Sequence, residues 1–130
     1  MKKLLERIKL CKLSPPQRRS LPYECYWEDS ILTQEQERIF SNQWLGLGRS
    51  DRLENPGEYE VFELCGKALV LIRNQDKELK LYANTCRHRG AKLLDGTGQC
   101  QAISCPFHGW TYSLDGNLKH AKTMAENPSF

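Results

Sequence analysis

The sequence Cys86-Arg87-His88 is followed, after sixteen further residues, by Cys105-Pro106-Phe107-His108. Each segment pairs one thiol with one imidazole at close range, so together they offer four metal ligands of two kinds. A mononuclear zinc site of two cysteines and two histidines usually has the spacing C-x₂₋₄-C followed by H-x₃₋₅-H. Here the two residue types alternate within each segment. This alternation favours a binuclear [2Fe–2S] cluster with two cysteines on one iron and two histidines on the other.

Such a cluster has a definite electronic consequence. Neutral imidazoles in place of two thiolates reduce the negative charge of the cluster and raise its potential above that of an all-cysteine ferredoxin. The pattern therefore predicts one-electron transfer, and a zinc site that only binds metal is the alternative interpretation.

The chain around these two segments has the pattern of short strands separated by turns. Polar or glycine-containing turns are expected at Cys65-Gly66-Lys67, at 74–77 and at Asp115-Gly116-Asn117. Short strands at close spacing are typical of a compact antiparallel β-sandwich or barrel. The expected strands are Tyr59–Leu64, Ala68–Arg73, Leu79–Ala83, Ala102–Ser104 and Thr111–Ser113.

The region before the strands is expected to be helical. Thr33 and Gln36 have the spacing of a capping box, which predicts a helix that begins at Thr33 and runs to about Trp44. Residues 1–22 carry a net charge of +6, and the remainder of the chain carries −3. Two interpretations fit the basic segment: a solvated arm, or a membrane-surface or targeting helix built on Leu4, Ile8 and Cys11.

Composition limits the class of protein. A chain of 130 residues has room for one core, and its 39% hydrophobic and 27% charged residues are ordinary for a soluble domain. No apolar run approaches a membrane span, and the acidic body argues against a nucleic-acid partner. Two of the six cysteines lie beside histidines at the spacing of metal ligands, and nothing in the sequence indicates secretion. This favours a reducing compartment, so we expect a cytoplasmic protein. The other four cysteines are expected to be ordinary thiols: Cys11, Cys25, Cys65 and Cys100.

The residues that flank the two segments resemble those of a known family. Cys86-Arg87-His88-Arg89-Gly90-Ala91 and 105–116 (CPFHGWTYSLDG) are similar to the CxHRGA and CPxHGWxYxLDG motifs of Rieske non-haem iron oxygenases, the α subunits of ring-hydroxylating dioxygenases and their monooxygenase relatives. Upstream, 37–44 and 55–59 also resemble these subunits. The resemblance covers about residues 21–125. It implies a mainly β, Rieske-type antiparallel sandwich or barrel with two cluster-binding loops and a short N-terminal helix.

Three positions indicate which Rieske class is nearest. Respiratory Rieske proteins carry a bracing disulfide between the positions of Ala91 and Phe107, and a serine at the position of Trp110. Tyr112 matches their second hydroxyl donor to the cluster. Loss of one donor lowers the potential, which suits an oxygenase. The alternative is a free-standing Rieske ferredoxin, an electron carrier that generally lacks Trp110 and the helical extension.

The resemblance also implies roles for individual residues and divides the chain. The expected ligands of one [2Fe–2S] cluster are Cys86, His88, Cys105 and His108. Around them we expect Arg89 to orient the loop or raise the potential, Gly90 and Gly109 to free the backbone, Trp110 to fill the core, and Tyr112 to donate a hydrogen bond. The expected divisions are a basic arm (1–22), a helical extension (23–50) and a Rieske domain (51–130).

The histidine count limits what the chain can do. Rieske oxygenases activate oxygen at a mononuclear Fe(II) held by two histidines and a carboxylate in a second domain. Beyond His88 and His108 the sequence has only His120, which is expected at the surface. We therefore expect the catalytic domain to be absent and the chain to end at 127–130, where the family continues. The expected partners are a reductase or ferredoxin donor and neighbouring α subunits in a trimer.

Overall fold

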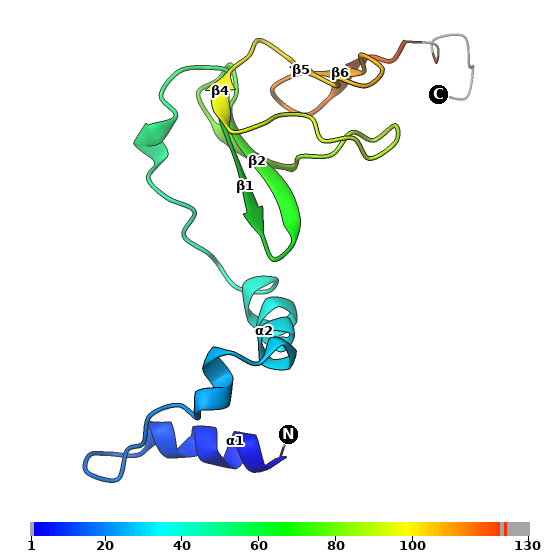
Figure 1. Ribbon diagram of the computed structural model, residues 1–130. Helices are drawn as coiled ribbons and strands as arrows, with labels where there is room; N and C mark the ends of the chain where they lie inside the picture. Colours follow the sequence, from blue (N-terminus) through cyan, green and yellow to red (C-terminus); the bar gives the residue numbers. More distant parts are fainter. Residues whose placement is uncertain (1, 123, 125–130) are drawn as a thin grey trace. The chain divides into compact units, whose positions relative to one another are not determined.

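The computed structural model describes residues 2–122 and 124, which fall into two units. The first lies within residues 2–46 and is helical, whereas the second begins at Leu47 and contains all the strands (Figure 1). In the described part of the chain, no helix has the length and apolar character needed to cross a membrane.

The first unit consists of two short helices and three single turns. Its helices are α1 (Lys2–Lys9) and α2 (Asp29–Glu35), and α2 continues as a π-helical turn to Phe40. Two 3₁₀ turns lie between the helices, at Leu10–Lys12 and Tyr23–Tyr26. An ion pair of 2.6 Å between Arg7 and Glu24 connects α1 to the second of these turns.

The predicted limits of the second helix were wrong at both ends. The helix begins at Asp29, whose carboxylate in the first turn favours that start through the helix dipole. Thr33 is therefore inside the helix, and its hydroxyl donates to the Asp29 carbonyl oxygen at 2.9 Å instead of capping. The helical segment ends at Phe40, and Trp44 lies beyond it, fully exposed.

The second unit contains two antiparallel sheets, which confirms the predicted fold class. The first sheet has the order β3-β2-β1-β4 and the second the order β5-β6-β7. A 3₁₀ turn at Ser50–Arg52 precedes them. The strands are β1 (Glu58–Leu64), β2 (Lys67–Arg73), β3 (Leu79–Ala83), β4 (Thr97–Gln99), β5 (Ile103–Ser104), β6 (Thr111–Tyr112) and β7 (Leu118–His120).

The hairpin of β1 and β2 has the predicted tight turn. Cys65 and Gly66 both have positive φ (52° and 72°), as a two-residue turn of this hand requires. The short strand β4 was not predicted, and it pairs with the start of β1. Gly57 allows this approach, because a Cβ there would lie 2.0 Å from the Cys100 carbonyl oxygen.

The core of the second unit joins the two predicted metal-binding segments to both sheets. Its buried members include both cysteines of those segments, and Ala91 and Leu93 pack against it from the chain after the first. The core residues are Ile72, Cys86, Ile103, Cys105, Trp110, Tyr112 and Leu114.

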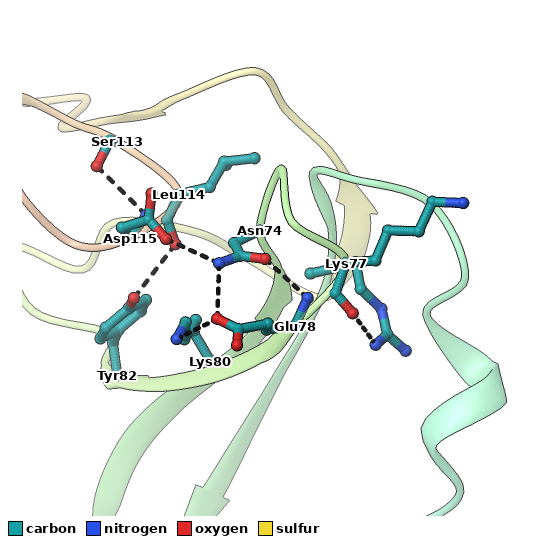
Figure 2. A network of polar contacts seen from close by, with 9 residues as sticks. Asn74, Lys77, Glu78, Lys80, Tyr82, Ser113, Leu114 and Asp115 are labelled. Atoms are coloured by element: carbon teal, nitrogen blue, oxygen red, sulfur yellow. Dashed lines mark hydrogen bonds and ion pairs between the residues drawn. The ribbon is translucent and has the colours of Figure 1, made fainter.

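Asn74 links the turn after β2 to the turn between β6 and β7 (Figure 2). Its side chain is 1% exposed. The amide donates to the Asp115 carboxylate at 2.9 Å, and its carbonyl oxygen accepts the Glu78 N–H at 2.7 Å. Tyr82 adds a second link, because its hydroxyl donates to the Leu114 carbonyl oxygen at 3.2 Å. These contacts connect the first sheet to the turn that follows β6 in the second sheet.

Asn84 closes the chain between β3 and β4 in the same way. It is 1% exposed, donates from Nδ2 to the Leu94 carbonyl oxygen at 2.7 Å and accepts the Leu94 N–H at 3.0 Å. The segment from 85 to 93, which includes the first predicted ligand pair, is thus a loop with its two ends tied together.

Replacing Asn84 by Ala is expected to destabilise the protein by about 2–4 kcal/mol, because the N–H and the carbonyl oxygen of Leu94 both lose the partner that the buried Asn84 side chain supplies. Urea unfolding followed by circular dichroism measures this. Asn117→Ala is the control, since Asn117 is exposed, and it is expected to change stability by less than about 0.5 kcal/mol. Equal effects of the two substitutions would contradict this role for Asn84.

Candidate metal centre

Two loops with the same backbone hydrogen bonds form the candidate site. In the first loop (residues 86–91), the Cys86 N–H donates to the Ala91 carbonyl oxygen at 2.8 Å, and the Gly90 N–H donates to that of Cys86 at 2.9 Å. The second loop (residues 105–110) repeats both bonds at the same spacing, at 2.7 Å and 3.0 Å. The fifth residue of each loop has positive φ and is a glycine, with φ of 72° at Gly90 and 70° at Gly109.

Both cysteines lie at the base of these loops in the core. Cys86 is 2% exposed and Cys105 is 3% exposed. The Tyr112 hydroxyl lies 3.3 Å from the Cys86 sulfur and accepts the Arg87 N–H at 3.1 Å, which leaves its own proton for the sulfur. Burial raises the pKa of the Cys86 thiol. Hydrogen bonds act in the opposite direction and lower this pKa overall; they come from the Tyr112 hydroxyl, the N–H groups of His88 and Arg89, and Cys105. The site therefore favours the thiolate, the form that binds metal.

Both histidines lie above the cysteines, half-buried, with their imidazoles in contact. Their ring centroids are 4.7 Å apart and the rings meet edge to face at 68°. Burial lowers the pKa of His88, and the nearby His108 and Arg89 lower it further, so this ring is neutral at pH 7. A neutral imidazole is the form that a metal requires.

The polar atoms of the two rings fit a metal cluster. Nδ1 of His88 and Nδ1 of His108 are both buried, and neither has a hydrogen-bond partner among the described residues. A buried nitrogen without a partner is costly in a folded protein, and a metal ion accepts its lone pair. Two such nitrogens, on the same two loops as two buried cysteines, make a donor set that suits a [2Fe–2S] cluster with mixed ligands.

The other residues predicted for the site lie around these four. The indole of Trp110 is 5% exposed and stacks on the His88 imidazole. Burial raises the pKa of Tyr112, and its contact with Cys86 raises it further, so its hydroxyl keeps its proton. Arg87 and Arg89 are exposed and form no ion pair within residues 2–122 and 124.

Some residues lie as expected outside the site, and others were missed. His120 is exposed at the end of β7, and all six cysteines are free thiols. Two residues that support the site were not predicted from the sequence. They are Asn84, which hydrogen-bonds across the ends of the segment that contains the first loop, and Asn74, which hydrogen-bonds to the turn after the second loop. Each follows a strand and looks like an ordinary turn residue, so only its partner across the fold identifies it.

The chain is similar to known proteins over most of its length. The carnitine monooxygenase oxygenase subunit of Escherichia coli is 35% identical over 118 residues, which cover 90% of this chain and 32% of that subunit. The benzene 1,2-dioxygenase subunit alpha of Pseudomonas putida is 32% identical over 103 residues, 78% of this chain and 23% of that one. The chain thus spans about a third or less of the length of these relatives.

A solved structure agrees with this likeness. It is that of a quaternary ammonium Rieske monooxygenase, with 34% identity and a TM-score of 0.78 over 84% of this chain and 30% of that one. These relatives are oxygenase subunits, which confirms the predicted origin over that of a free-standing ferredoxin. Residues 43–130 match the Rieske [2Fe-2S] domain family. The chain therefore belongs to the Rieske [2Fe-2S] domain family and is homologous to the N-terminal part of Rieske oxygenase α subunits.

Proposed function

We propose that Cys86, His88, Cys105 and His108 hold the [2Fe–2S] cluster and that the chain relays single electrons to an oxygenase centre. The observation that carries this proposal is the pair of buried, unpartnered Nδ1 atoms on the two loops that also hold two buried cysteines. The cluster, when bound, supplies a reversible one-electron carrier. The protein contributes the ligands, their protonation states and the separation of the sulfur side from water.

The histidine side is the side through which electrons enter and leave. His88 and His108 are only half-buried and line a cavity of about 460 Å³ together with Phe107, Gly109 and Lys122. The two cysteines, in contrast, are members of the hydrophobic core. A partner that approaches the cavity comes closest to the imidazole edges.

The relatives support a proposal for the partners and the reaction. A reductase or ferredoxin is the proposed donor, and the proposed acceptor is a mononuclear Fe(II) in a catalytic domain of a neighbouring α subunit of a trimer. One relative oxidises carnitine and has inter-subunit electron transfer, and another is a benzene dioxygenase. The proposed reaction is accordingly the oxygenation of a small organic compound, with ring hydroxylation as one form of it. The four cysteines outside the proposed ligand set are free thiols, which supports a cytoplasmic location.

The purified chain is expected to contain two irons and two labile sulfides per molecule, as its family implies. In His108→Cys, a thiolate replaces a neutral ligand and is expected to lower the reduction potential, because the cluster becomes more negative. Metal analysis and redox titration followed by EPR measure both. The control is His120→Cys, at an exposed histidine outside the site, and it is expected to keep the wild-type potential. Equimolar zinc and no EPR signal would refute the proposal.

Tyr112→Phe is expected to lower the reduction potential of the cluster, because the hydrogen bond to Cys86 stabilises the more negative reduced state. The matched control is Tyr82→Phe, which removes a hydroxyl that donates to the Leu114 carbonyl oxygen and not to a cysteine. Protein-film voltammetry compares the three proteins. The same potential in Tyr112→Phe and the wild type would show that this hydrogen bond does not act on the cluster.

A further inference from the structure

The indole of Trp110 lies flat against the imidazole of His88. The ring centroids are 4.9 Å apart and the planes differ by 11°. Trp110 is 5% exposed and belongs to the hydrophobic core, so neighbouring side chains fix the indole. His88, which lies nearer the surface, therefore packs against a rigid aromatic wall.

Stacking is the main restraint on the His88 ring in the described part of the chain. Its Nδ1 has no hydrogen-bond partner there, and its other ring contact is the edge-to-face one with His108. His108 differs in this respect. The ring packed against it is that of Phe107, which is tilted by 34° and 62% exposed. The two imidazoles are thus held unequally, and His88 has the firmer support.

Trp110 also connects the two loops. Its carbonyl oxygen accepts the Cys105 N–H at 2.7 Å and so closes the second loop, to which it belongs. Its side chain reaches the histidine of the first loop. One residue thereby fixes the distance between a cysteine of one loop and the histidine of the other.

We propose that Trp110 is a positioning residue, which holds the His88 imidazole with Nδ1 directed into the cluster site and thereby keeps the reduction potential low. This proposal rests on the proposed function. A neutral imidazole gives electron density to iron when the cluster is bound, more so in the oxidised state, and the electron-rich face of the indole stabilises the ring in that polarised form. The indole also excludes water, which would otherwise stabilise the more negative reduced cluster. Both effects lower the potential.

Two variants at this position test the proposal. Trp110→Leu removes the aromatic face and is expected to shift the potential upwards and to change the EPR g-values of the reduced cluster. Trp110→Phe keeps an aromatic face and is expected to stay close to the wild type in both. Leu114→Ala is the control for lost core volume, since Leu114 is 2% exposed and belongs to the same core. It is expected to lower the unfolding temperature and to leave the potential and g-values unchanged.

Two outcomes would overturn the proposal. Trp110→Leu could lose stability like Leu114→Ala and keep the wild-type potential and g-values, in which case Trp110 only fills the core. Trp110→Phe could shift both as far as Trp110→Leu, in which case stacking is not the cause.

A measurement on the metal-free 130-residue chain covers a variant that fails to load the cluster. The ring current of Trp110 is expected to move the His88 ring protons upfield in the NMR spectrum of the wild type, to a smaller extent in Trp110→Phe. Unshifted His88 protons in the metal-free wild type would refute the stacking itself. A wild type that shows the upfield shift but binds no iron would instead refute the proposed function.

Discussion

The backbone of each loop closes on its own cysteine, and the rest of the site depends on this closure. The cysteine N–H binds the carbonyl oxygen five residues on, and the glycine N–H four residues on binds the cysteine carbonyl oxygen. A left-handed glycine makes this possible in both loops. The loops differ in one respect, because the histidine is the third residue of the first and the fourth of the second. Two similar backbones thus present their imidazoles at different angles, and the rings meet edge to face.

Two buried asparagines attach these loops to the sheets. Asn84 ties both ends of the first loop to each other, and Asn74 ties the turn that follows the second loop to the turn after β2. Side-chain amides suit this role, because one amide both donates and accepts and can satisfy two backbone or carboxylate groups at once. The site is therefore supported by polar contacts that run through the core and not by loop packing alone.

The sequence predicted those features that depend on local chemistry. The β1–β2 hairpin and the turn at Gly116 follow from residue types at fixed spacings, and the ligand pairs, inferred in the same way, stay a prediction. The strand β4 was missed because its residues, Thr97–Gln99, are exposed and include a glycine, so they lack the alternation of a strand. The predicted start of the helix was wrong because Thr33 fits a capping pattern. The helix begins at Asp29 instead, where the carboxylate interacts favourably with the helix dipole. The roles of Asn74, Asn84 and Trp110 depend on partners in other segments, which a linear pattern does not contain.

The cysteines and histidines of the site are buried to different extents, so the site has one covered side and one accessible side. The two cysteines lie in the core at 2% and 3% exposure, whereas the two imidazoles border an open cavity. The rate of electron tunnelling falls steeply with distance. A cluster held there would therefore exchange electrons faster through the imidazole side than through the sulfur side. Under the proposed function, donor and acceptor would share one small face of the domain. They would then either dock in succession, or each would approach the edge of a different histidine.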